Sequence, residues 1–165
     1  MVTVTGGSNK RVSLAAPIAV KPGQRPRLIY RVHHGRRSRA DKRKGFTETD
    51  YARLLDAAHQ QLGGPLVVVW DNSNTHVSAA MAGLVAARDW LTVFQLPPYA
   101  HELNPVELVW SHLKRSLANL TKQNLGQLTA LAKTRLRRMQ YRPGLLTGFL
   151  TGTGLDLTPF CNPGN

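Results

Sequence analysis

The chain has 165 residues, of which 42% are hydrophobic, so it is long enough for one domain with its own core. It carries 22 Lys and Arg against 9 Asp and Glu, a formal charge of +13. The hydrophobic fraction excludes a disordered basic tail, and the charge makes nucleic acid the first partner to consider, because phosphates attract clustered cations.

Several other classes of protein are also excluded. The single cysteine, Cys161, has no partner for a disulfide within the chain, and no His or Cys lies near it at zinc-ligand spacing. No apolar run approaches the roughly 20 residues that span a bilayer, and the first residues lack the pattern of a signal peptide. We therefore expect a cytoplasmic protein with no membrane partner.

The first elements in chain order are two β-leaning runs, 11–20 and 27–34, separated by the turn signal Pro22–Gly23. They predict an antiparallel hairpin. A basic block follows, which is typical of a solvated loop and is equally suited to contact phosphates. Its cations, with two from a later helix, are the candidate nucleic-acid contacts: Arg36, Arg37, Arg39, Lys42, Arg43, Lys44, Lys114 and Arg115.

The middle of the chain predicts a helix and then a strand–helix–strand unit. Thr47 and Asp50 resemble a capping box, so a helix should begin there and end at Gly63–Gly64. The apolar run 65–70 is typical of a strand buried on both faces, and it stops at Asp71. A helical pattern over 76–90 and a second apolar run over 91–96 then favour two parallel strands.

The last part of the chain predicts two further helices. One begins around Asn104 and Pro105 and carries apolar residues on one face as far as Leu120. The other covers 124–140 and combines an apolar face with several Lys and Arg. The Gly-, Pro- and Thr-rich stretch 143–165 is expected to have no regular structure, so we divide the chain into a domain over 1–142 and an irregular tail over 143–165.

Two carboxylates fall at the ends of predicted elements. Ligands gather beyond the carboxyl ends of parallel strands, where Asp71 lies, and a Pro-rich loop leads from the next strand to Glu107. Carboxylates suit Mg²⁺ or Mn²⁺, and a pair of such ions supports phosphodiester cleavage or transfer. Each residue also has a structural explanation: Glu107 as the cap partner of Asn104, Asp71 with Asn72 as a strand-ending turn, and His76 as a helix-start residue. Spacing alone leaves these alternatives open.

Two motifs carry a resemblance to a known family. The stretch "VVVWDNSNTH", with Asp71, Asn72 and His76, is followed by "FQLPPYAHELNPVELVWSHLK", with Asn104, Glu107 and Trp110. Together they resemble the catalytic domain of bacterial insertion-sequence transposases related to the mariner group, within the DDE superfamily of endonucleases. The 35 residues between Asp71 and Glu107 are close to the spacing of the second and third acids in that family.

The resemblance implies an α/β fold of the ribonuclease-H-like type, a mixed sheet flanked by helices. It implies DNA transposition, with cleavage at element ends and strand transfer by two Mg²⁺ or Mn²⁺ ions. Asp71 and Glu107 are then the catalytic metal ligands, with Asn72, His76 and Asn104 in support. The implied partners are element-end and target DNA and a second copy of the chain, and the implied location is the nucleoid.

One departure from the family pattern bears on activity. The first catalytic Asp of the family lies on an opening strand, and no such acid-bearing strand is recognisable here. The acids before Asp71 are Asp41, Glu48, Asp50 and Asp56, in the basic block and the first helix, and none is a credible substitute. The chain resembles either a truncated copy or the product of the second of two reading frames that are joined by ribosomal slippage. In the second case it needs a segment encoded by the upstream frame, which we call the upstream-frame segment. Its activity is therefore left open. The alternative is a non-catalytic, basic nucleic-acid-binding module or an inactive relic.

Overall fold

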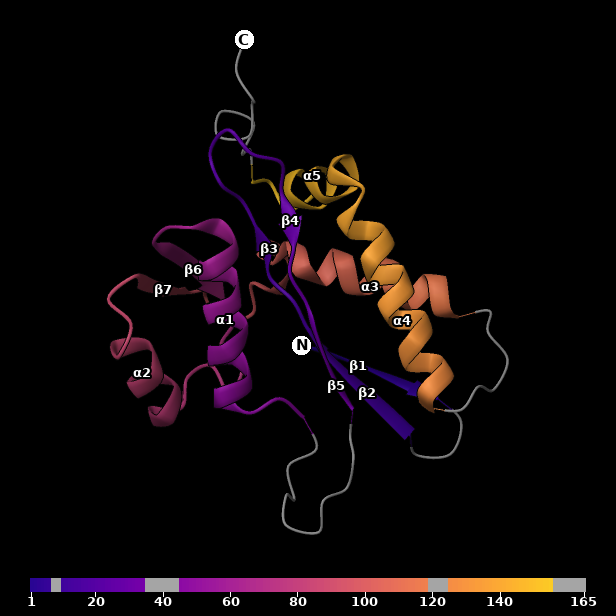
Figure 1. The fold of residues 1–165 in the computed structure, drawn as a ribbon, viewed down its shortest axis with the longest axis horizontal. Helices are drawn as coiled ribbons and strands as arrows, with labels where there is room; N and C mark the ends of the chain where they lie inside the picture. The colour runs from indigo at the N-terminus through magenta and orange to yellow at the C-terminus, as the bar shows by residue number, and fades with distance from the viewer. Residues whose placement is uncertain (7–9, 35–44, 119–124, 156–165) are drawn as a thin grey trace. The chain divides into compact units, whose positions relative to one another are not determined.

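The structure is a computed structural model that describes residues 1–6, 10–34, 45–118 and 125–155. It contains two compact units, which we call unit 1 (Met1–Gly45 and Pro105–Asn165) and unit 2 (Phe46–Asn104). The elements of unit 1 are β1 (Val2–Gly6), β2 (Lys10–Ala15), β3 (Ile18–Ala19), β4 (Arg27–Leu28), β5 (Arg31–His34), α3 (Pro105–Leu117), α4 (Leu125–Gln140) and α5 (Pro143–Thr151) (Figure 1).

The sheets of unit 1 confirm the predicted hairpin and add a strand to it. β2 pairs antiparallel with β5, and β3 pairs antiparallel with β4. The hairpin is divided in two next to Pro17, which has no N–H to donate to a ladder. β1, which we did not predict, pairs antiparallel with the other side of β2. This opening strand has the sequence VTVTG and contains no acid.

The helices of unit 1 pack around one hydrophobic core. α3 and α4 begin and end close to the predicted positions, and the fully buried Trp110 of α3 is 1% exposed. α4 contacts β2, β4 and β5 as well as α3 and α5. The buried residues of this core are Val2, Val12, Leu14, Leu28, Val109, Trp110, Leu113, Leu117, Leu128, Ala132, Leu136, Met139, Leu146 and Phe149.

The expectation of an irregular segment directly after 142 was wrong. Residues Pro143–Thr151 form α5, which begins with a proline in its first turn and buries Leu146, Phe149 and Leu150. The glycines and threonines of this stretch have low helix propensity, but burial of an apolar face outweighs that propensity. The remainder of the predicted tail, from residue 156, lies outside the described residues.

Unit 2 contains α1 (Glu48–Leu62), β6 (Leu66–Trp70), α2 (Ala79–Ala86), β7 (Leu91–Gln95) and a short 3-10 helix, η1 (His101–Leu103). α1 confirms its predicted signals. Thr47 and Asp50 form a capping box, and Gly63 ends the helix with a left-handed φ of 64°. Phe46 and Tyr51, whose positions are those of a hydrophobic staple, have ring centroids 5.7 Å apart.

The strand–helix–strand unit is confirmed in topology and corrected in detail. β6 and β7 are parallel, with Val69 opposite Phe94. Burial on both faces was wrong, because the side chains of Val67, Val69 and Phe94 are 69%, 59% and 57% exposed. α2 is shorter than predicted and begins after Ser78, whose hydroxyl accepts from the Met81 N–H at 3.1 Å.

Candidate active site

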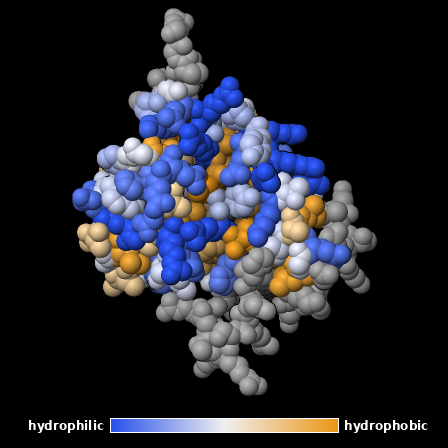
Figure 2. Space-filling view, viewed as in Figure 1, coloured by the Kyte–Doolittle hydropathy of each residue, from blue (hydrophilic) through white to orange (hydrophobic). Residues whose placement is uncertain are grey.

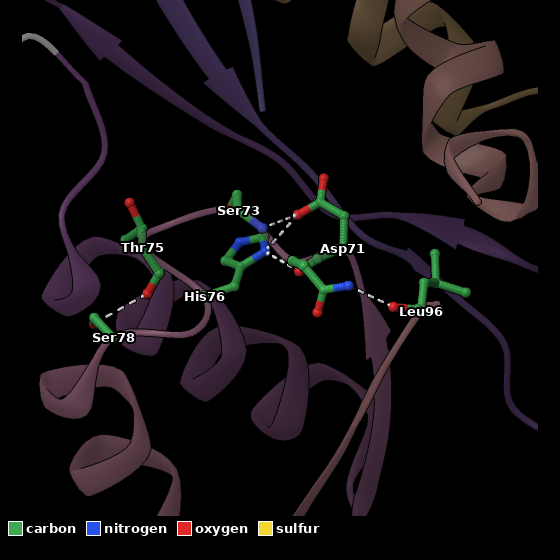
Figure 3. A network of polar contacts seen from close by, with 7 residues as sticks. Asp71, Ser73, Thr75, His76, Ser78 and Leu96 are labelled. Carbon is green, nitrogen blue, oxygen red and sulfur yellow. Dashed lines mark hydrogen bonds and ion pairs between the residues drawn. The ribbon is translucent and has the colours of Figure 1, made fainter. Parts of the chain in front are cut away.

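Asp71 follows β6 directly and sits at the carboxyl end of the parallel strand pair, as predicted. Its Oδ1 accepts a hydrogen bond from the Ser73 backbone N–H at 3.2 Å and lies 2.8 Å from Nδ1 of His76. Figure 3 shows the other carboxylate oxygen pointing away from both groups. The network therefore fixes the carboxylate with one oxygen and leaves the second oxygen directed elsewhere.

His76 is held in one orientation by ring contacts and by Asp71. The imidazole stacks on Trp70 at 4.4 Å between centroids, and it forms a T-shaped pair with the Tyr51 ring at 4.7 Å between centroids. Nδ1 also lies 3.2 Å from the backbone oxygen of Asp71, so both neighbours of Nδ1 are acceptors and the proton belongs on Nδ1. Nε2 is buried and has no hydrogen-bond partner among the described residues.

The electrostatics of this network keep Asp71 ionised. The hydrogen bond from His76 lowers the pKa of Asp71 far below its ordinary value and outweighs the opposing effect of burial. Burial raises the pKa of Tyr51 to about 12, and the negative charges of Asp71 and Asp50 act in the same direction. At neutral pH the cluster is therefore a carboxylate beside a neutral phenol, with the hydrogen-bonding imidazole on its other side.

Asn72 ties the two strand ends together. Its side-chain amide donates to the backbone oxygen of Leu96 at 2.7 Å, just beyond the end of β7. The loop after β6 and the loop after β7 are thereby joined at the edge of the sheet where Asp71 lies. The predicted supporting residue Asn72 and the predicted His76 are thus both in direct contact with this edge.

The acids that precede Asp71 in the described part of unit 2 have structural partners. Asp50 caps α1, and Asp56 accepts from Arg88 at 2.7 and 3.0 Å. Glu48 accepts from the Ser78 hydroxyl at 3.2 Å. Within the described residues, no group of three or more His, Cys, Asp and Glu is placed to hold a metal ion. Asp41 lies outside the described residues.

The remaining predicted site residues are distributed over both units. Asn104 is the last residue of unit 2, and Glu107 lies in the first turn of α3 in unit 1. The proximity of Glu107 to Asp71 therefore stays a prediction. Lys114 and Arg115 are exposed in the last turn of α3, and the basic block 36–44 lies outside the described residues.

The sequence analysis did not predict the contacts of the Trp70 and Tyr51 rings with His76. Trp70 ends an apolar run and Tyr51 lies on a helix face, and both patterns look the same whether or not a histidine packs against them. The contact with Ser73 was also missed, although an aspartate commonly accepts from the backbone N–H two residues further on, in an Asx turn. None of the described helices is long and apolar enough to cross a membrane.

Solved structures that are similar to this chain include two of a transposase catalytic domain. The catalytic domain of Mos1 transposase, in a solved structure with Raltegravir and Mn, matches with a TM-score of 0.54 at 12% identity, covering 87% of this chain and 78% of that chain. A second solved structure, of the Mos1 mariner transposase catalytic domain, matches with a TM-score of 0.43 at 12% identity, covering 87% of this chain and 81% of that chain. No curated protein matches.

The first of these similarities establishes a ribonuclease-H-like mixed α/β fold, which the family resemblance implied. The family comparison reaches further, because it matches residues 10–129, well over half of the chain, to the family described as DDE superfamily endonuclease. The matched region includes both Asp71 and Glu107. The chain therefore belongs to the DDE superfamily of endonucleases.

Proposed function

We propose that the chain acts in DNA transposition, supplying two of the carboxylates of a transposase that cleaves and joins DNA strands with Mg²⁺ or Mn²⁺. Family membership supports the reaction class, and the similar Mos1 structure is described as containing Mn. In this proposal Asp71 and Glu107 are the catalytic residues and metal ligands, and Asn72, His76 and Asn104 support them.

The observation that carries the proposal is the state of the Asp71 carboxylate. An ionised carboxylate oxygen that points away from its hydrogen-bond donors suits a hard divalent cation, which prefers oxygen ligands. Bound ions activate the attacking oxygen and stabilise the leaving oxygen in phosphodiester chemistry. In this proposal Glu107, in the first turn of α3, contributes the second carboxylate.

His76 has the role of a positioning residue. It donates from Nδ1 to Asp71 Oδ1, so that Asp71 offers its other oxygen to a ligand. Contacts with Trp70 and Tyr51 hold the plane of the ring, and a half-turn of the ring would break the contact between Nδ1 and Asp71. Residues that form a hydrogen bond to a metal ligand commonly fix the orientation of that ligand. Asn72 supports the site without a contact to the Asp71 carboxylate in this proposal, because its hydrogen bond joins the loops that follow β6 and β7.

A third acid is needed for two ions, and it comes from an upstream-frame segment in this proposal. Glu48, Asp50 and Asp56 already have partners, and β1 contains no acid. DNA ends and target DNA are the substrates, a second copy of the chain completes the assembly, and the place of action is the nucleoid. The second candidate is a non-catalytic DNA-binding module, which is favoured by the lack of a three-acid group among the described residues.

The test is cleavage of a DNA duplex by the full chain fused to an upstream acid-bearing strand. We expect nicking in Mg²⁺ or Mn²⁺ and none in EDTA, because the proposed chemistry depends on bound cations. The unfused chain is the matched control and is expected to bind DNA with little or no cleavage. Cleavage that continues in EDTA contradicts the proposal, and DNA binding without cleavage by any fused form favours the non-catalytic candidate.

The role of His76 predicts a specific order among its variants. His76→Ala in the fused chain should lower cleavage about 10- to 100-fold, the usual cost of removing a residue that orients a metal ligand. His76→Asn places an amide nitrogen near the position of Nδ1, whereas His76→Gln places it near Nε2. We therefore expect His76→Asn to need less Mn²⁺ for half-maximal cleavage than His76→Gln. Equal Mn²⁺ dependence of two equally stable variants contradicts the positioning role.

A further inference from the structure

The net positive charge of the chain comes from unit 1. This unit contains 20 Lys and Arg against 3 Asp and Glu, a formal charge of +17. Unit 2 contains 2 Lys and Arg against 6 Asp and Glu, a formal charge of −4. Electrostatic attraction to a polyanion is therefore exerted by unit 1, whereas Asp71 lies in a unit that repels phosphate on its own.

α4 carries part of this charge on a face that is not used for packing. Leu128, Ala132, Leu136 and Met139 are buried in the core, whereas the opposite side of the helix is exposed. We call the exposed residues Lys133, Arg137 and Arg138 the α4 basic face. In Figure 2 strongly hydrophilic residues gather over the region where the C-terminal half of α4 lies in Figure 1.

Among the residues that the structure describes, no ion pair accounts for the α4 basic face. α4 itself, with the sequence LGQLTALAKTRLRRMQ, contains no Asp or Glu. In the described part of unit 1 the only acid is Glu107, in the first turn of α3. Cations in the last turn of a helix interact well with its dipole, which explains Arg137 and Arg138 in part. Lys133 lies before that turn, one helical turn from Arg137, where like charges are unfavourable.

The spacing of these cations suits a phosphate backbone. Lys133 and Arg138 are about 7.5 Å apart along the helix axis at 1.5 Å per residue. A DNA duplex presents one phosphate per strand about every 3.4 Å along its axis, so this length of helix faces two or three phosphates. The cations lie on the outside of a packed helix, where they can reach a backbone without entering a groove.

We propose that the α4 basic face is a docking surface for the sugar–phosphate backbone of duplex DNA, in addition to the candidate contacts that the sequence indicated. The inference rests on the proposed function only in taking DNA as the partner. Contacts to phosphates position a duplex without reading its sequence. The surface therefore holds DNA on unit 1 irrespective of the sequence at the cleavage site.

The test measures how the affinity of the full chain for a labelled duplex of arbitrary sequence depends on salt, in EDTA. The triple variant K133Q, R137Q and R138Q should reduce the slope of log affinity against log salt by about 2 to 3, since each neutralised phosphate contributes about 0.9. The double variant R137K and R138K should keep the slope, because the charges remain. Arg53→Gln, which removes an exposed cation from α1 of unit 2, is the matched control and should leave the slope unchanged.

Circular dichroism and thermal melting establish that each variant is folded, and single substitutions replace the triple variant if it is not. An unchanged slope in the folded variants overturns the inference, and so does an equal reduction in Arg53→Gln. EDTA prevents metal-dependent cleavage, so the result does not depend on catalysis. Loss of cleavage with an intact binding slope affects only the proposed function, and cleavage with an unaltered slope in the triple variant affects only the α4 basic face.

Discussion

Asp71→Asn in the fused chain is expected to abolish DNA cleavage while unit 2 remains folded. Asn keeps an oxygen that can accept from His76 and Ser73, so the network of Figure 3 can still form. The substitution removes the negative charge that attracts a divalent cation. A metal ion contributes several kcal/mol of transition-state stabilisation, and about 1.4 kcal/mol corresponds to a tenfold rate, so we expect a loss of about 10³-fold or more.

Glu107→Gln should have a loss of similar size, because the proposal assigns both carboxylates to the same ions. Glu102→Gln is the matched control, since Glu102 is an exposed acid in η1 outside the proposed ligand set. Cleavage is followed with a labelled duplex at saturating Mn²⁺, together with the melting temperature of each variant. Cleavage at the rate of the unsubstituted chain in either Asp71→Asn or Glu107→Gln removes that residue from the site.

Local signals in the sequence were sufficient to predict most elements of the fold. The capping box of α1 and the parallel pair β6–β7 depend on residues close together in the chain, and both are present. α5 was missed because the segment is rich in Gly and Thr, and only burial of Leu146, Phe149 and Leu150 makes a helix favourable there. The helix around α2 was predicted over 76–90 because the helical pattern of apolar residues continues on both sides of α2, and the N-cap at Ser78 was not recognised.

The candidate site also has a part that the sequence predicted and a part that it did not. The strand end predicted the position of Asp71, and the motif predicted His76 nearby. The enclosure of His76 by Tyr51 and Trp70 could not be predicted, because it depends on how α1 packs beside the end of β6. The relation of Asp71 to Glu107 joins two units and stays a prediction for the same reason: no local pattern specifies it.

Trp110→Ala is expected to cost about 3–5 kcal/mol of unfolding free energy in unit 1, the usual range for deleting a large buried aromatic side chain. Trp110 is 1% exposed and lies in the core that joins α3 to α4 and α5. Many domains have only about 5–15 kcal/mol of stability, so a large part is lost. Urea unfolding followed by circular dichroism measures the change, with Tyr141→Ala as the control, because that side chain is 74% exposed.

Trp110→Phe separates packing from hydrogen bonding at the same position. The indole Nε1 of Trp110 is buried without a hydrogen-bond partner among the described residues, so Phe loses volume but no hydrogen bond. We expect a cost of about 1–2 kcal/mol, within the ordinary range for single substitutions. Equal costs for Ala and Phe would contradict a packing role.

Because Glu107 lies one turn before Trp110 on α3, Trp110→Ala should also reduce cleavage in the fused chain at temperatures where the variant is still folded, and Trp110→Phe should retain most of it.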